Sequence, residues 1–326
     1  MSSFVGSPAE RLSLPRAVDA LADAARRAGR PSLVWFVGIL YPSLNLNLDL
    51  VRGVLALVRE ASGIDLPWAG ERGGVATLFA PGLPGVSVVG DGAGEVARLF
   101  LYLPLFLISY RLIVGLVKVS DPLHVPKNPE MVPTGSTGVQ AARGERLRTI
   151  WAEGRGLGMM ALCLWAMLLA LLLGAMLVLI GPVLALLKVL GLASVSPLVF
   201  GLLAPVLFLI LAYAAVLMVL NQLALHSLAH NNRGVASALT HAWRLVRASP
   251  MSALRATLVD FALFLALLLT GVMISDVLLA PSVFEGLSSL IVLALYGFVG
   301  VTRAGFWART YRALGGLSSV DRVPGL

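Results

Sequence analysis

Two long charge-free apolar runs constrain the fold of this chain more than any other feature of its sequence. They extend from Leu157 to Ile180 and from Leu198 to Leu220, and neither contains a charged residue. An α-helix rises about 1.5 Å per residue, so about 20 apolar residues cross the ~30 Å hydrocarbon core of a bilayer. Both runs exceed that length, and only 13% of the chain is charged, against about a quarter in soluble proteins. The sequence therefore predicts an all-α fold, a polytopic transmembrane helical bundle.

The hydropathy pattern predicts about six spans with short amphipathic helices at the membrane interface. The expected spans are residues 33–58, 99–117, 157–180, 197–230, 251–279 and 282–306. The expected organisation is a cytoplasmic amphipathic N-terminal helix (1–32), two spans (33–118) with an extracytoplasmic loop at 59–98, a cytoplasmic linker (119–143), a four-span domain (144–306) and a basic cytoplasmic tail (307–326). A helix is expected to start near Gly144, run through the span at 157–180 and end at Gly181-Pro182. Whether residues 33–58 cross fully stays open, because Pro42 interrupts that run.

Basic residues give the expected orientation. With both termini inside, the cytoplasmic segments 1–32, 118–155, 222–255 and 303–326 hold 19 Arg and Lys, and the opposite side holds five. Cytoplasmic loops collect basic residues, so this asymmetry explains the pI of 10.2 without nucleic acid as a partner. Only three of the 25 basic residues are lysine, a bias typical of GC-rich bacterial genomes. We expect a bacterial cytoplasmic (inner) membrane protein with both termini in the cytoplasm.

Two amphipathic helices are predicted on the cytoplasmic side. For the first, over residues 13–29, Ser13 can cap the start and Gly29 the end. Its apolar face comprises Leu14, Val18, Leu21, Ala22 and Ala25. A basic helix with one apolar face is typical of helices that lie on an anionic bilayer surface, and a protein partner or solvent is the alternative. The second helix covers residues 235–248.

Four polar residues lie in apolar runs and are the candidate residues of a substrate or ion path: Asn45, Asp49, Arg111 and Asp260. Ionised groups in a membrane interior are costly and usually face the inside of the bundle. The alternative is a buried structural pair. In the expected topology Arg111 and Asp260 lie at equal depth below the cytoplasmic surface, which predicts an ion pair between them.

Motifs for chemistry are sparse. His226 and His230 are spaced for one helical face, with His241 as the nearest third ligand, but the glutamate of an H-E-x-x-H site is missing. We therefore interpret them as interfacial histidines at a helix end, and we predict no metal. Gly154 and Gly158 have the spacing of close helix packing, because no strand precedes them as a dinucleotide loop requires. No nucleophile elbow is visible, so we predict no catalytic residues and no cofactor.

One stretch resembles a known pattern. Residues 230–258, HNNRGVASALTHAWRLVRASPMSALRATL, and the tail WARTYRALGG at 307–316 are similar to segments of uncharacterised bacterial multi-pass membrane proteins. Those proteins resemble the membrane domain attached to some glycerophosphodiester phosphodiesterases. The matching residues are Gly234, Ala238, Ala242, Trp243 and Pro250. The resemblance implies a helical membrane fold and no activity, because the catalytic phosphodiesterase domain has no counterpart here.

Three classes of function remain. The first is a non-enzymatic membrane subunit or scaffold, whose partners are the lipid bilayer and a protein bound through the basic cytoplasmic segments. The second is a small permease or lipid-handling transporter that uses the intramembrane charges. The third is a membrane enzyme, for which His226, His230, Asp260 and Glu153 would supply the chemistry. The absence of a catalytic motif favours the first class.

Overall fold

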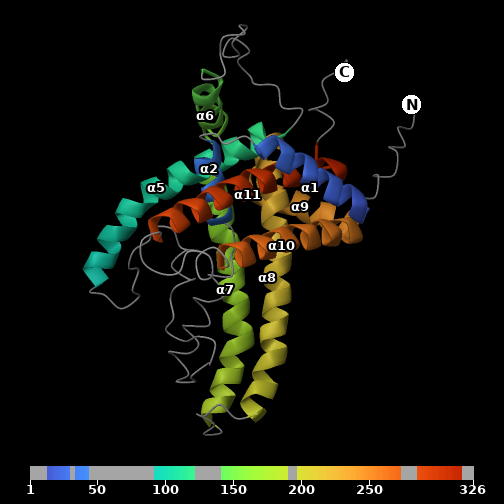
Figure 1. Cartoon of the computed structure of the whole chain (residues 1–326). Coiled ribbons are helices and arrows are strands. Elements are labelled where there is room, and N and C mark those ends of the chain that lie inside the picture. The colour runs from blue at the N-terminus through green and yellow to red at the C-terminus, as the bar shows by residue number, and fades with distance from the viewer. Residues whose placement is uncertain are drawn as a thin grey trace, which may run out of the picture. The chain divides into compact units, whose positions relative to one another are not determined.

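The computed structural model describes residues 13–29, 34–43, 92–121, 141–189, 197–272 and 285–317. These residues form helices joined by turns, and no strand occurs among them. The helices are α1 (Leu14–Ala28), α2 (Val34–Ser43), α5 (Gly92–Val119), α6 (Ala141–Glu153), α7 (Gly158–Val189), α8 (Pro197–Asn231), α9 (Val235–Ala248), α10 (Pro250–Val272) and α11 (Glu285–Ala313) (Figure 1). The all-α prediction is confirmed for this part of the chain.

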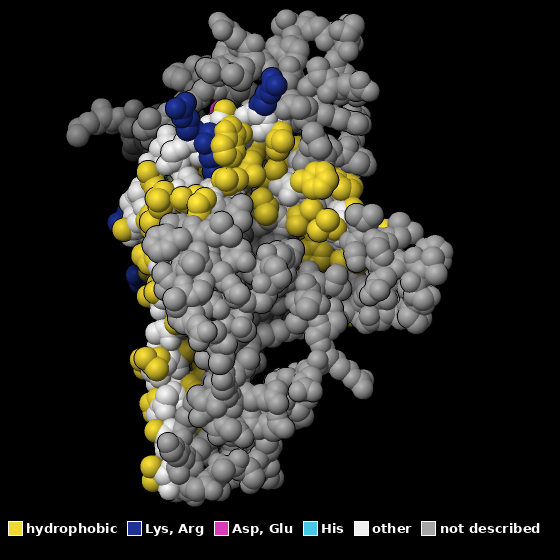
Figure 2. Space-filling model, turned by 90° about the vertical axis from the view of Figure 1, so that its left-hand side faces the viewer, with side chains coloured by type: hydrophobic (Ala, Val, Ile, Leu, Met, Phe, Trp, Pro, Cys, Tyr) yellow, Lys and Arg dark blue, Asp and Glu magenta, His cyan; other side chains and the backbone are white. Residues whose placement is uncertain are grey.

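Four helices are long and apolar enough to cross a membrane, judged by length and composition. The segments are Gly158–Val183 in α7, Ala204–Asn231 in α8, Pro250–Leu267 in α10 and Ile291–Ala313 in α11. The other two expected spans correspond to α2 and α5 where they are described, and the count of six stays a prediction. On the face that Figure 2 shows, the described surface is largely hydrophobic, and Lys and Arg side chains gather mainly toward its upper part.

The chain divides into two compact units. The first combines residues 1–42, 90–164 and 222–326, and the second combines 43–89 and 165–221. In the second unit, large apolar side chains of α7 and α8 such as Leu177, Val178 and Phe208 are more than two-thirds exposed. Exposed apolar side chains on apolar helices suit contact with lipid. All the polar contacts described below lie in the first unit.

Helix α11 organises the first unit, packing against α1, α10 and α5. In Figure 1, α1 and α10 lie on either side of it. Residues 302–308 of α11 are buried without a break. Three arginines of α11 each form an ion pair with an aspartate from a different element: Arg303 with Asp260 of α10, Arg309 with Asp23 of α1, and Arg312 with Asp121 after α5. These ion pairs join three elements to one helix.

Helix α1 begins and ends as predicted. The Ser13 hydroxyl accepts a hydrogen bond from the Arg16 amide, and Gly29 follows the last turn. The side packed against the protein is an alanine face, with Ala17, Ala24 and Ala28 buried. Leu14 and Val18, from the predicted apolar face, are each 49% exposed. That predicted face thus lies beside the packed one and stays available for contact outside the chain.

Glycines permit the closest helix contacts. A Cβ added at Gly154 would overlap the Arg111 carbonyl oxygen, and one at Gly158 would lie 3.1 Å from the Arg111 Cβ. The predicted packing role of these two glycines is confirmed. The sequence analysis missed a second contact, in which α2 and α11 cross so closely that a Cβ at Gly300 would overlap the Gly38 carbonyl oxygen. Side chains larger than hydrogen cannot fit at such crossings.

Three predicted boundaries are wrong. Residues 92–98, expected in a loop, are helical and open α5. The helix expected to run from residue 144 into the next span is broken at 154–157, because Gly156 adopts a left-handed φ of +79° that ends α6. Helix α7 then continues through Pro182 to Val189. Proline is tolerated within membrane helices because neighbouring groups can satisfy the freed carbonyl. The start of α8 at Pro197 and the bounds of α9 are confirmed.

Candidate functional site

Two buried charges, Arg303 and Asp260, form an ion pair between α10 and α11. The Arg303 Nε donates to Asp260 Oδ1 at 2.6 Å, and a terminal nitrogen of Arg303 donates to Oδ2 at 2.7 Å. Only 5% of the Arg303 side chain and 8% of the Asp260 side chain are exposed. Two parallel charge-assisted bonds are the geometry that a guanidinium offers a carboxylate. The pair fixes α10 and α11 against each other.

The predicted ion pair between Arg111 and Asp260 is therefore wrong. The Arg111 Nε donates to the Trp151 carbonyl at 3.0 Å, and its guanidinium lies 3.6 Å from the centre of the Trp151 ring. Helix α5 packs against α6, which places Arg111 beside Trp151, whereas α11 packs against α10. Arg303 was assigned to the cytoplasmic segment 303–326, but α11 continues to Ala313 and keeps it inside the bundle.

Tyr41 and Gln222 complete the surroundings of the pair. The Tyr41 hydroxyl donates to the Gln222 side-chain carbonyl, and Arg303 lies 6.0 Å from the centre of the Tyr41 ring. Both residues are almost fully buried. We call Tyr41, Gln222, Asp260 and Arg303, from α2, α8, α10 and α11, the Asp260 cluster. The sequence analysis found only Asp260 of these four.

A second group of buried side chains surrounds the end of α8, and we call His226, His230 and Tyr311 the His226 cluster. The rings of His226 and His230 are stacked 5.6 Å apart at 15°, and Tyr311 stacks on His226 at 5.8 Å and on His230 at 6.2 Å. His226 is fully buried within the protein, and both histidines lie near the end of α8, so their position at the membrane interface stays a prediction. Among the described residues, no three His, Cys, Asp or Glu side chains converge on one point as a metal site requires.

Hydrogen bonds tie the His226 cluster to the chain on both sides. Asp121 lies 3.8 Å from the His230 Nδ1 and accepts from the Arg312 Nε at 2.9 Å. The Asn231 amide donates to the Tyr311 hydroxyl and to the Gly316 carbonyl, both at 2.8 Å. These contacts hold the end of α8 against the end of α11.

His241 of α9 also contacts the Gly316 carbonyl, through its Nε2 at 3.1 Å. Burial is the main cause that lowers the pKa of His241 from its ordinary 6.5. The hydrogen bond to Gly316 opposes this shift, and the charges of Arg233 and Arg244 add to it. The neutral imidazole with its proton on Nε2 is the form that suits this contact.

Several buried polar atoms near the His226 cluster have no hydrogen-bond partner among the described residues. They include both ring nitrogens of His226, the Ser227 hydroxyl, the Thr310 hydroxyl and the Trp307 Nε1. A buried polar group without a partner costs about 1–3 kcal/mol. Such atoms are the places where a buried water or a small polar ligand would be stabilised.

Three candidate residues remain to be placed. Asn45 and Asp49 lie outside the described residues. Glu153 forms an ion pair with Lys118 at 3.5 Å that links α6 to α5. The described geometry thus brings Asp260 together with an arginine, and His226 together with His230, while Arg111 and Asp260 have different partners.

The chain was compared with known proteins. No protein-family model, no curated protein and no solved structure matches it. The resemblance of residues 230–258 to a membrane-domain pattern therefore stays a prediction.

Proposed function

We propose that this chain is a non-enzymatic subunit or scaffold of a bacterial inner membrane, with six spans and both termini in the cytoplasm. The observation that carries the proposal is the closed geometry of the Asp260 cluster. Both oxygens of Asp260 accept from Arg303, and the Tyr41 hydroxyl donates to Gln222. Charges that satisfy each other fix helices in place, whereas a transport path needs groups that can exchange their partner for a substrate.

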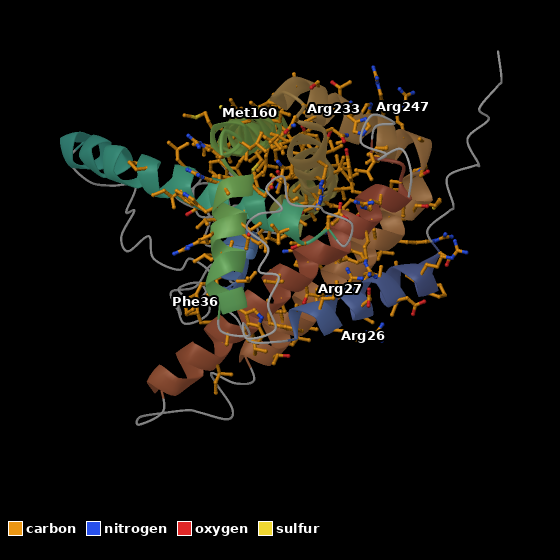
Figure 3. The ribbon with its side chains drawn as sticks, turned by 90° about the horizontal axis from the view of Figure 1, so that it is seen from above. Arg26, Arg27, Phe36, Met160, Arg233 and Arg247 are labelled. Atoms are coloured by element: carbon orange, nitrogen blue, oxygen red, sulfur yellow. The ribbon has the colours of Figure 1, made fainter. Side chains whose placement is uncertain are left out.

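The proposed partners are the bilayer and another protein that binds the basic cytoplasmic segments. Helix α1 supports this, because Leu14 and Val18 are half exposed while the opposite edge carries Arg26 and Arg27. The side chain of Arg26 is 76% exposed. Figure 3 shows Arg26 on the outer side of α1. An exposed face with both apolar and basic groups suits a contact outside the chain.

Purification in a gentle detergent followed by quantitative mass spectrometry tests the proposal. We expect one protein to co-purify in a fixed ratio with the full chain. Reversing charge in Arg26→Glu with Arg27→Glu should lower that ratio if the partner binds α1. Cys163→Ala alone serves as the matched control, because it changes α7 and leaves α1 intact. A chain that purifies without any partner in fixed ratio would contradict the scaffold proposal.

Cysteine labelling tests the proposed topology. In a Cys163→Ala background, a cysteine at position 87 should react only from outside the cytoplasm. A cysteine at position 320 should react only from the cytoplasmic side. Labelling of position 87 from the cytoplasmic side alone would refute the six-span arrangement.

A permease or lipid-handling transporter is the second candidate, favoured by the unpartnered buried atoms near the His226 cluster. A transported polar molecule could supply the missing hydrogen bonds of His226, Ser227 and Thr310. Thermal stability measured against a panel of small polar solutes tests this function. If one solute stabilises the protein and this stabilisation is lost in Ser227→Ala, the result would favour the transporter over the scaffold.

A further inference from the structure

Helix α9 divides into a packed alanine side and an exposed basic side. Ala238, Ala242 and Leu245 are buried, and α9 packs against α10. At 100° per residue, Arg244 and Arg247 fall on the opposite side, and both are exposed. By the same spacing Trp243 also falls on the exposed side, about 40° from Arg247, and it is 46% exposed.

The basic side of α9 has no acidic residue near it in the sequence. Residues 232–259 contain four arginines and neither Asp nor Glu. None of the ion pairs found among the described residues involves Arg244 or Arg247. Figure 3 labels Arg233, which precedes α9, and Arg247, which lies in the last turn of that helix. These arginines thus present positive charge that the described chain does not neutralise.

Helix α10, which follows α9 in the chain, carries an exposed apolar row. Met251, Leu254, Leu258 and Phe261 recur every three to four residues and are each more than half exposed. Lipid-facing side chains have this spacing on a membrane helix. Tryptophan is enriched where headgroups meet acyl chains, and arginine beside it can reach phosphate. Along the chain, Trp243 precedes Arg244 and Arg247, and the apolar row that suits acyl chains follows them.

We propose that α9 binds the headgroups of anionic phospholipids through Arg244 and Arg247, with Trp243 at the boundary to the acyl chains. Guanidinium groups bind phosphate through paired hydrogen bonds, and phosphatidylglycerol adds a net charge that phosphatidylcholine lacks. The exposed Trp243 and the apolar row favour a lipid surface over an acidic protein, because a protein ligand of the arginines would leave that row uncovered. This proposal is independent of whether the chain is a scaffold.

The test titrates phosphatidylglycerol against phosphatidylcholine into the full-length protein in a neutral detergent, with the unfolding temperature as the readout. We expect phosphatidylglycerol to raise the unfolding temperature more than phosphatidylcholine does. A basic residue near an anionic surface contributes about fivefold in affinity. Arg244→Gln with Arg247→Gln should therefore lower the affinity of the protein for phosphatidylglycerol about 30-fold. The same variant should respond to phosphatidylcholine as the original chain does.

Two further variants make the result decisive. Arg244→Lys with Arg247→Lys retains the charge and should keep most of the preference for phosphatidylglycerol. Arg155→Gln, in the break between α6 and α7, is the control, because it removes an exposed arginine outside α9, and it should keep the preference for phosphatidylglycerol. An unchanged titration in the Arg244 and Arg247 glutamine variant would overturn the proposal. Equal stabilisation by both lipids, or by an acidic peptide in place of phosphatidylglycerol, would overturn it as well.

Discussion

Replacing Arg303 by methionine removes both hydrogen bonds that the Asp260 carboxylate accepts from it, at 2.6 and 2.7 Å. The methionine fills similar space, so the main change is a carboxylate left without its counter-charge where only 8% of its side chain is exposed. Removing one partner of a buried pair costs about 3–5 kcal/mol in the free energy of unfolding. We expect Arg303→Met to lower the free energy of unfolding by about 3–5 kcal/mol.

A second substitution, Asp260→Leu, removes the carboxylate that Arg303→Met leaves without a partner. Replacing a buried pair by apolar residues of similar volume is often neutral or stabilising. Asp260→Leu added to Arg303→Met should therefore recover most of the loss, with a coupling energy of about 2–3 kcal/mol. Reversible unfolding in mixed detergent micelles, followed by helical circular dichroism, measures all four corners of this double-mutant cycle.

Arg111→Met provides the matched control for the cycle. It loses a cation–π contact with Trp151 worth about 0.5–1 kcal/mol and one hydrogen bond worth about 0.5–1.5 kcal/mol. Arg111 and Asp260 pair with other residues. The stability lost in Arg111→Met should therefore add to the stability lost in Asp260→Leu, with no coupling energy. Additive losses for Arg303 and Asp260, or coupling between Arg111 and Asp260, would refute the pairing that the structure describes.

Three other changes have expected outcomes. His226→Phe keeps the stacking on Tyr311 and removes two unpartnered nitrogens, so we expect unchanged or slightly higher thermal stability; a large loss would mean that a bound water or ligand satisfies the ring. Gly300→Leu should lower the yield of folded protein sharply because its Cβ would overlap the facing carbonyl, whereas Gly174→Leu, with nothing within 4 Å, should be tolerated. The lowered pKa of His241 means that the folded state binds fewer protons than the unfolded state below pH 6.5. Stability should therefore fall as pH drops through 6.5, and a pH series of unfolding midpoints should be flatter in His241→Gln.

Helix start signals and apolar lengths were predictable because they depend on the local chain. The Ser13 cap and the start of α8 at Pro197 both follow the sequence. The end of a helix was harder to predict. Pro182 interrupts the pattern, yet α7 continues, while the break before α7 depends on a left-handed glycine, Gly156, that the apolar pattern does not reveal.

The position of Asp260 within a helix was predictable, but the position of Arg303 and the pairing of the two were not. Asp260 lies ten residues into α10 and Arg303 ten residues before the end of α11. At about 1.5 Å per residue, both lie about 15 Å from those helix ends. The same arithmetic had paired Asp260 with Arg111, because depth along a helix says nothing about which helices touch. That choice depends on packing features such as the crossing of Gly38 and Gly300, which places Tyr41 of α2 near Arg303.

The positions of the carboxylates separate two roles of arginine in this chain. Each of the three paired arginines of α11 meets an aspartate from a different element, so its charge is used inside the protein to join α10, α1 and the end of α5. Arginines 244 and 247 on α9 have no acidic residue between positions 232 and 259 and form no ion pair with the described residues. An unpaired guanidinium at the surface attracts whatever anions lie outside the chain. The first group of arginines therefore accounts for how the helices are held together, and the second for where the protein meets an external anion.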